Sequence, residues 1–197
     1  MSGLAVPSFD AMPHDFRQTP PDLPVPVDDG AADHLPGLTL PPVRLPSTLG
    51  GDVDLGEAAG LLVLYVYPRT GRPDEPLIEG WDAIPGARGC TPQSCAFRDH
   101  VADLARVGAR VMGLSAQSPE DQQEFAAREH IPYPLLSDPS LRLAAELRLP
   151  TFTAAGLVLY RRLTLVARDG RIEKAFYPVF PPERNAADVL AWLGDAP

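Results

Sequence analysis

From residue 60 onward, the hydrophobic and polar positions of this chain alternate between strand-like and helix-like patterns. The segment Gly60–Tyr67, GLLVLYVY, is almost wholly apolar and is followed by Pro68. Such a run predicts a central strand that is buried on both faces of a sheet. The apolar run ARVMGLSA at residues 109–116 predicts a second buried strand, and residues 134–137 predict a short third strand.

Between these strands, apolar residues recur every three or four positions, as in an amphipathic helix. The repeat predicts one helix over residues 92–107, with a proline in the first turn, where a missing N–H costs little. Ser118 and Pro119 predict the start of another helix, as its N-cap and its first helical residue. Shorter helices are expected over residues 139–147 and 185–193.

Two further strand patterns, at residues 157–166 and 172–177, flank the turn sequence RDGR at residues 168–171. This arrangement predicts an antiparallel hairpin. An edge strand or hairpin is also expected from Leu35 onward. The order strand-helix-strand-helix-strand-strand-helix predicts an α/β fold with a mixed central sheet flanked by helices.

Proline divides the chain, because 10 of its 24 prolines fall in residues 1–48. Proline fixes φ and removes a backbone donor, so residues 1–35 are expected to form neither a long helix nor a central strand. We predict a proline-rich N-terminal arm over residues 1–34, extended or partly disordered, and a folded domain over residues 35–197. Residues 69–87 are rich in proline and glycine and predict a loop after the first strand.

The charge balance limits the classes of partner that this protein is expected to bind. With 17 basic and 26 acidic residues, the formal net charge is −9. No basic patch is expected that could neutralise the phosphates of a nucleic acid or an anionic membrane. The sequence has no apolar run of about 18 residues that predicts a transmembrane helix and no secretory signal pattern. Two cysteines are too few for the disulfide framework of a small secreted protein. We therefore expect a soluble, cytoplasmic protein.

Both cysteines lie in the segment GCTPQSC at residues 89–95. Cys90 falls at the junction between the predicted loop and the predicted helix, where free N–H groups and the positive end of the helix dipole favour a thiolate. Arg88, two residues earlier, adds positive charge. This placement indicates a reactive thiol more than an ordinary buried cysteine.

The spacing of the two thiols separates the possible chemistries. Four residues lie between Cys90 and Cys95, whereas a thioredoxin-type redox pair has two. Two thiols, and four histidines without metal-ligand spacing, argue against a zinc site. No histidine partner for a protease-type nucleophile is identifiable. Reduction of a peroxide by one thiol, with the second thiol as its partner, fits the spacing best.

A disulfide between these two cysteines would need a change of local structure. On one helix, a step of five residues gives a rise of about 7.5 Å and a net rotation of about 140°. The two Cα atoms would then lie about 9 Å apart, beyond the roughly 7 Å that a disulfide allows. A Cys90–Cys95 bond therefore requires the start of the helix to unwind.

The run GCTPQSCAFRD at residues 89–99 resembles the active-site segment of the atypical two-cysteine peroxiredoxins of the peroxiredoxin Q, or bacterioferritin comigratory protein, subgroup. The similarity extends from about Leu35 to Leu193. It includes the strand that ends in Tyr67-Pro68, the segments GLSAQSPEDQQEFA and PLLSD, and RLTLV before the Asp-Gly turn. The resemblance implies a thioredoxin-like fold and thiol-dependent reduction of hydrogen peroxide and organic hydroperoxides.

The resemblance also implies roles for individual residues. Cys90 would be the peroxidatic thiol and Cys95 the resolving thiol. Pro68 would shield the pocket, and Arg162 would contact the thiolate and the peroxide oxygens. Arg161 and Arg162 are adjacent on a predicted strand, so their side chains should point to opposite faces and only one can enter the pocket. The register favours Arg162.

One departure from the family pattern concerns the hydroxyl that orients the peroxide. The family places a proline seven residues before the peroxidatic cysteine and a threonine three residues before it. Here Pro68 precedes Cys90 by 22 residues, 15 more than in the family, and the minus-three position is Ala87. Thr70 is our candidate for the missing hydroxyl, and Thr91 is the second.

The implied reaction forms a sulfenic acid on Cys90, which condenses with Cys95 to give an intramolecular disulfide. A thioredoxin-type dithiol donor would reduce that disulfide, with no metal or organic cofactor, in a monomer or weak dimer. Two alternatives stay open at this stage. The chain could be a protein thiol–disulfide oxidoreductase, or a peroxide sensor that docks through its proline-rich arm.

Overall fold

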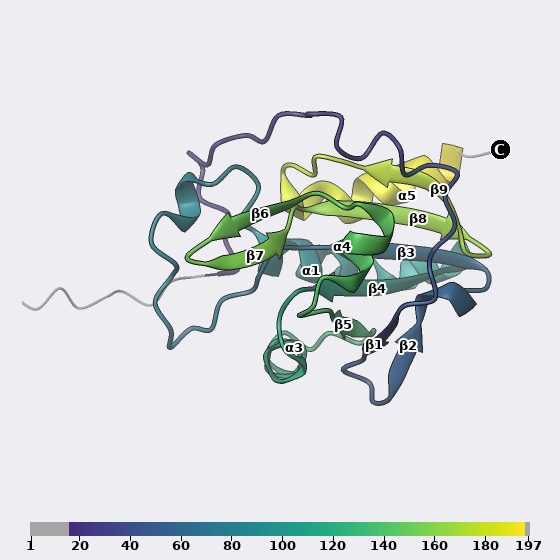
Figure 1. Cartoon of the computed structure of the whole chain (residues 1–197), viewed down its shortest axis with the longest axis horizontal. Helices are drawn as coiled ribbons and strands as arrows, with labels where there is room; N and C mark the ends of the chain where they lie inside the picture. The colour runs from purple at the N-terminus through teal and green to yellow at the C-terminus, as the bar shows by residue number, and fades with distance from the viewer. Residues whose placement is uncertain (1–15, 196–197) are drawn as a thin grey trace, which may run out of the picture.

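The computed structural model is built on a mixed five-stranded sheet with the order β5-β4-β3-β8-β9 (Figure 1). The central strand β3 (Leu61–Val66) runs parallel to β4 (Ala109–Ser115), which in turn runs parallel to β5 (Leu135–Ser137). On its other side β3 is antiparallel to β8 (Leu163–Arg168), and β8 is antiparallel to β9 (Arg171–Phe176). The mixed sheet flanked by helices confirms the predicted fold class.

Helices cover both faces of this sheet. In Figure 1, α4 lies in front of the sheet, and α1 and α5 lie behind it. The rear face carries α1 (Cys90–Asp99), α2 (Val101–Arg106), α3 (Pro119–Arg128) and α5 (Asn185–Asp195). The front face carries α4 (Arg142–Leu147) and the hairpin of β1 (Arg44–Pro46) and β2 (Asp52–Asp54). Three short 3-10 helices are η1 (Leu55–Glu57), η2 (Trp81–Ala83) and η3 (Pro182–Arg184).

Every residue of β3 is buried, because the strand has a hydrophobic core on each side. Leu62, Leu64 and Val66 join the front core, together with residues of α4. The alternate residues of β3 join the rear core with Phe97 of α1 and Phe125 of α3. The prediction of a strand buried on both faces is confirmed, and Tyr65 near the carboxyl end of β3 donates to Oγ of Ser94 on α1 at 3.1 Å.

The prediction of one helix over residues 92–107 was wrong about where the helix begins and about its continuity. The helix begins at Cys90, and Pro92 is its third residue. The first four N–H groups of a helix have no partner within it, so the proline is tolerated there as well as at the first position. The helix is then interrupted at His100, whose φ of −101° and ψ of 6° separate α1 from α2.

The prediction of one strand over residues 157–166 was also wrong. Residues 157–160 form β7 (Leu157–Tyr160), which pairs with β6 (Thr151–Ala154) in a separate two-stranded sheet. The chain then enters the central sheet as β8, and Arg161 and Arg162 form the connection between the two sheets. Strand β6 was not predicted.

Two local predictions from turn and cap chemistry are confirmed. The hydroxyl of Ser118 accepts a hydrogen bond from the N–H of Asp121, and Pro119 is the first residue of α3. Asp169 and Gly170 both have positive φ, 47° and 77°, in the turn between β8 and β9. This is the geometry of a two-residue hairpin turn of type I′.

The structure describes residues 16–195, so residues 1–15 of the predicted arm lie outside the described part. Residues 16–34 contain no helix or strand and run along the folded domain (Figure 1). Phe16 and Ala32 are buried there, and Arg17 forms an ion pair with Glu129. Within the described part of the chain, no helix is long and apolar enough to cross a bilayer.

Candidate active site

Cys90 is the first residue of α1 and is buried, with 4% of its surface exposed. Gly89 precedes it with a φ of 99°, a left-handed conformation that glycine adopts without strain. A Cβ on Gly89 would lie 2.3 Å from Cγ of Pro182, so the close approach of η3 also requires glycine. The sharp turn at Gly89 places the Cys90 sulfur at the N-terminal end of α1, as predicted.

The side chain of Arg162 reaches this sulfur from the start of β8. Its Nη2 donates to Cys90 Sγ at 3.2 Å, and Arg162 is itself only 3% exposed. The same Nη2 donates to the carbonyls of Gly86, Ala87 and Arg88 at 3.2, 3.1 and 3.0 Å. These carbonyls are uncharged, so the buried guanidinium is placed to stabilise negative charge on the sulfur.

A buried polar chain holds the guanidinium in this orientation. Nη1 of Arg162 donates to Oε1 of Gln93, on the first turn of α1. Nε2 of Gln93 donates to Oδ1 of Asn185 at 2.9 Å, and Oγ1 of Thr164 donates to the same oxygen at 2.7 Å. All four side chains are buried and hydrogen-bonded, so the arginine has little freedom to leave the sulfur.

A surface pocket opens onto Cys90, and the segment between Pro68 and Cys90 supplies most of its wall. The lining residues are Phe16, Arg69, Thr70, Gly71, Arg72, Glu75, Pro76, Leu77, Ile78, Trp81, Arg88, Gly89, Cys90 and Thr91. Trp81 is 5% exposed and packs against Phe152, with ring centroids 6.1 Å apart. The tryptophan therefore anchors the inserted loop and also forms part of the pocket wall.

Of the predicted hydroxyl and proline, only Thr70 lines this pocket, and Pro68 is not among the lining residues. The hydrogen bonds of the described residues include none from Thr70 to the Cys90 sulfur. Thr70 lines the pocket, and its Oγ1 donates to Oε1 of Gln117 at 3.0 Å. Thr91 is buried and lines the same pocket. Pro68 is buried at the end of β3, and its carbonyl accepts a hydrogen bond from Oγ of Ser115.

Arg161 points elsewhere. Its guanidinium lies over the ring of Phe152, 5.9 Å from the centroid, whereas that of Arg162 contacts the Cys90 sulfur. Both arginines line a second pocket with Tyr177 and Pro178. The two arginines therefore diverge, as predicted, although they do so from a connection between sheets and not from a strand.

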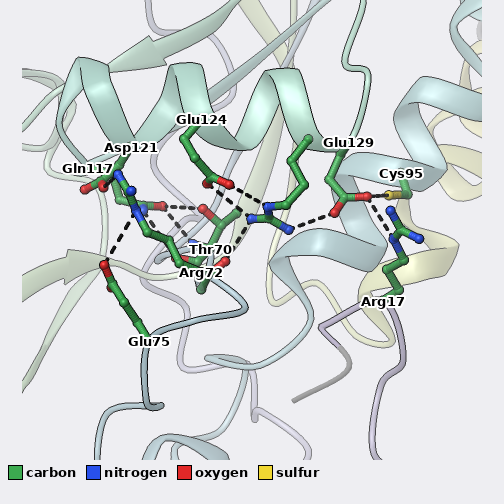
Figure 2. Close-up of polar contacts among 11 residues, drawn as sticks. Arg17, Thr70, Arg72, Glu75, Cys95, Gln117, Asp121, Glu124 and Glu129 are labelled. Atoms are coloured by element: carbon green, nitrogen blue, oxygen red, sulfur yellow. Dashed lines mark hydrogen bonds and ion pairs between the residues drawn. The ribbon is translucent and has the colours of Figure 1, made fainter. Parts of the chain in front are cut away.

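Cys95 lies on α1 with Cys90, and both are free thiols. The thiol of Cys95 is half-buried, and its Sγ donates to Oε2 of Glu129 at 3.8 Å (Figure 2). Burial raises the pKa of this thiol, and the Glu129 carboxylate raises it further against the opposing effect of Arg98. Burial and the Glu129 carboxylate both favour the protonated form of Cys95 in this conformation.

Sequence reasoning missed three residues at this site: Gln93, Asn185 and Glu129. Gln93 lies inside the GCTPQSC segment, so its position in that motif was an available signal. Asn185 and Glu129 are 92 and 34 residues away in sequence from their partners Gln93 and Cys95, and no local pattern marks them. Within residues 16–195, no group of three or more histidine, cysteine or acidic side chains could hold a metal ion.

The site and the fold together define a class of protein. Thiol-redox proteins of thioredoxin-like fold typically place a thiol at a helix N-terminus, beside a buried arginine. The helix lies at the edge of a mixed sheet that is covered by helices. A family model described as Redoxin matches residues 35–190. The chain belongs to the peroxiredoxin family, in its peroxiredoxin Q and bacterioferritin comigratory protein subgroup, and peroxiredoxins are thiol-dependent peroxidases.

Curated relatives support this membership. The chloroplastic peroxiredoxin Q of Sedum lineare is 30% identical over 158 residues, covering 80% of this chain and 76% of that protein. A putative peroxiredoxin of Mycobacterium tuberculosis is 30% identical over 151 residues, covering 73% and 85%.

Solved structures agree in fold. Peroxidoxin BcpB from Mycobacterium tuberculosis superposes with a TM-score of 0.67 at 27% identity, covering 82% of this chain and 97% of that one. A mutant of Xylella fastidiosa PrxQ superposes with a TM-score of 0.66 at 23% identity, covering 81% and 94%.

Proposed function

We propose that this protein reduces hydrogen peroxide and organic hydroperoxides at Cys90, using Cys95 as the resolving thiol. The observation that carries the proposal is the 3.2 Å contact from Nη2 of Arg162 to Sγ of Cys90, at the N-terminus of α1. A thiolate is the nucleophilic form of cysteine, and both the guanidinium and the helix end stabilise it.

In the first step, the Cys90 thiolate attacks one peroxide oxygen and the O–O bond breaks. The sulfur is oxidised to a sulfenic acid, and the other oxygen leaves as water or an alcohol after taking a proton. The guanidinium of Arg162 and the free N–H groups of α1 stabilise the negative charge that develops on the leaving oxygen. Gln93 and Asn185 keep the guanidinium in position for this role.

In the second step, the Cys95 thiol condenses with the sulfenic acid to give an intramolecular disulfide and water. A dithiol donor of the thioredoxin type then reduces the disulfide by exchange. The pair lies on one helix in the reduced form, so the proposal includes a local change of α1 between the two steps.

We also propose that the protein works in the cytoplasm, as a monomer or weak dimer. Cytoplasmic reductants keep thiols such as Cys90 and Cys95 in the reduced form that the reaction needs. Size-exclusion chromatography with light scattering on the reduced and oxidised protein tests the assembly state.

The decisive test of the function is multiple turnover. Purified protein is mixed with a large molar excess of hydrogen peroxide or cumene hydroperoxide, together with thioredoxin, thioredoxin reductase and NADPH. We expect many equivalents of peroxide to be consumed per protein. Consumption that stops after one equivalent, with donor still in excess, would favour a sensor, and efficient insulin reduction without peroxide turnover would favour a protein thiol–disulfide oxidoreductase.

A further inference from the structure

Glu129 is a buried carboxylate that the proposed peroxide chemistry does not use. It caps the C-terminal end of α3, and its side chain is 2% exposed. Its Oε1 accepts from Nη1 of Arg128 at 2.8 Å, and its Oε2 accepts from Nε of Arg17 at 3.1 Å (Figure 2). The same Oε2 is the atom that accepts the hydrogen bond from the Cys95 thiol at 3.8 Å.

We infer that Glu129 is a positioning residue for the resolving thiol: its hydrogen bond holds Cys95 in the folded helix and so delays disulfide formation. The inference rests on the proposed function, because it concerns the second step of that reaction. Its consequence is a longer lifetime of the Cys90 sulfenic acid than the two thiols alone would give.

The first argument is geometric. Cys90 and Cys95 are five positions apart on a continuous helix, so their sulfurs cannot bond while α1 is intact. Cys95 must leave Glu129 before it can reach Cys90. The contact between Cys95 and Glu129 is present in the reduced protein and is lost before the disulfide forms. Its loss raises the barrier to disulfide formation.

The second argument is electrostatic. The attacking species in resolution is the thiolate of Cys95, and its formation is opposed while the thiol lies beside a carboxylate. Burial is the main cause of the raised pKa of Cys95, and the Glu129 carboxylate adds to it while Arg98 opposes it. Leaving the carboxylate therefore both frees the sulfur and eases its deprotonation.

The third argument concerns what holds Glu129 in place. Arg128, its partner on α3, also donates from Nη2 to the carbonyl of Gly71 at 2.9 Å, in the loop that lines the Cys90 pocket. Arg17, its other partner, belongs to the N-terminal arm. The carboxylate is thus held by arginines from α3 and from the N-terminal arm, and Arg98 of α1 donates from Nη1 to the backbone carbonyl of Glu129 at 2.7 Å.

The delayed step balances without an external oxidant. The S–H bond of Cys95 and the S–O bond of the Cys90 sulfenic acid break, and the S–S bond forms. The Cys95 sulfur is oxidised and the Cys90 sulfur is reduced. The hydroxyl of the sulfenic acid takes up one proton and leaves as water. Cys95 releases one proton, so the number of protons balances.

The test compares Glu129→Gln with the matched control Glu124→Gln. Glu124 is the other carboxylate partner of Arg128, through Nε at 2.7 Å, and it makes no hydrogen bond to Cys95. Reduced protein is mixed with hydrogen peroxide in a quenched-flow instrument, free thiols are alkylated, and the products are counted by mass spectrometry. Oxidation of Cys90 depends on peroxide concentration, whereas disulfide formation does not, so the two rates separate.

We expect Glu129→Gln to form the disulfide about 5- to 30-fold faster, the range that corresponds to losing one or two kcal/mol of restraint. The rate of Cys90 oxidation should stay unchanged, as should both rates in Glu124→Gln. The fraction of Cys90 converted to sulfinic acid at high peroxide should fall in Glu129→Gln, because a shorter-lived sulfenic acid meets less peroxide.

An unchanged or slower disulfide step in Glu129→Gln would overturn the inference, and a slower step would identify Glu129 as a general base for Cys95. If the amide variant fails to fold, Glu129→Asp keeps the charge but withdraws it from the sulfur, and a smaller acceleration is expected. No oxidation of Cys90 in the unmodified protein would instead refute the proposed function, so the two failures are distinguishable.

Discussion

The guanidinium of Arg162 donates to the sulfur of Cys90 across 3.2 Å, although the two residues are 72 positions apart in the chain. Arg162 stands where the chain passes from β7 into β8, and Cys90 stands where the inserted loop enters α1. The mixed sheet brings these two junctions together at one end of β3. The contact is the structural basis of the peroxidase chemistry proposed for this chain.

Replacement of Arg162 by alanine should slow the attack of Cys90 on peroxide by about 10²–10³-fold, by analogy with the loss of one oxyanion-hole donor. The rate is measured by competition for peroxide or by single-turnover kinetics. The neighbouring Arg161→Ala is the control and should stay close to the unmodified protein, because Arg161 lies over Phe152. A loss confined to Arg161→Ala would show that the wrong arginine was assigned.

Thr70→Val should lower kcat/KM for hydrogen peroxide by about tenfold, the effect of about 1.4 kcal/mol, if its hydroxyl orients the peroxide. Thr70→Ser, which retains a hydroxyl, should restore most of the activity. Thr91→Val is the comparison, since Thr91 lines the same pocket. A full effect in Thr91→Val and none in Thr70→Val would transfer the role to Thr91.

The inserted loop should affect organic hydroperoxides more than hydrogen peroxide. Leu77 and Ile78 form part of the pocket wall, so an apolar substituent on the substrate can bury its surface against them. The double variant Leu77→Ala, Ile78→Ala should lower kcat/KM for cumene hydroperoxide by about 5- to 30-fold. Activity toward hydrogen peroxide should be unchanged, and the exposed Leu49→Ala is the control. Equal loss for both substrates would contradict a role in selectivity.

Oxidation should unwind α1 between Cys90 and Cys95, because an intact helix keeps the two sulfurs apart. Amide hydrogen exchange in residues 90–95 should be faster in the disulfide form than in the reduced form. Several helical hydrogen bonds, each worth about 0.5–1.5 kcal/mol, oppose the disulfide. Its potential should therefore lie above about −300 mV. An oxidised structure with an intact helix and a Cys90–Cys95 bond would refute this expectation.

Much of the fold could be predicted from the sequence because local chemistry specifies it. The apolar run of β3, the Ser118 cap and the RDGR turn each carry their own physical signal. The break in residues 157–166 carries no such signal. At Arg161 and Arg162 the chain passes from the two-stranded sheet into the central sheet, and tertiary packing alone determines this.

Some residues of the candidate site could likewise be predicted from local sequence, and others could not. The position of Cys90 at a helix start follows from the glycine and proline around it, so it could be predicted locally. The placement of Arg162 was expected from resemblance to a family. Asn185 and Glu129 reach the site from α5 and from the end of α3, and only the folded chain brings them to Gln93 and Cys95.

The most direct test of the account is the stoichiometry of peroxide consumption by reduced protein without a donor. Cys90→Ser should consume no peroxide, whereas Cys95→Ser should consume one equivalent and stop with a sulfenic acid on Cys90, trapped by dimedone and identified by mass spectrometry. If Cys90→Ser still consumed one equivalent while Cys95→Ser consumed none, the peroxidatic role of Cys90 would be contradicted.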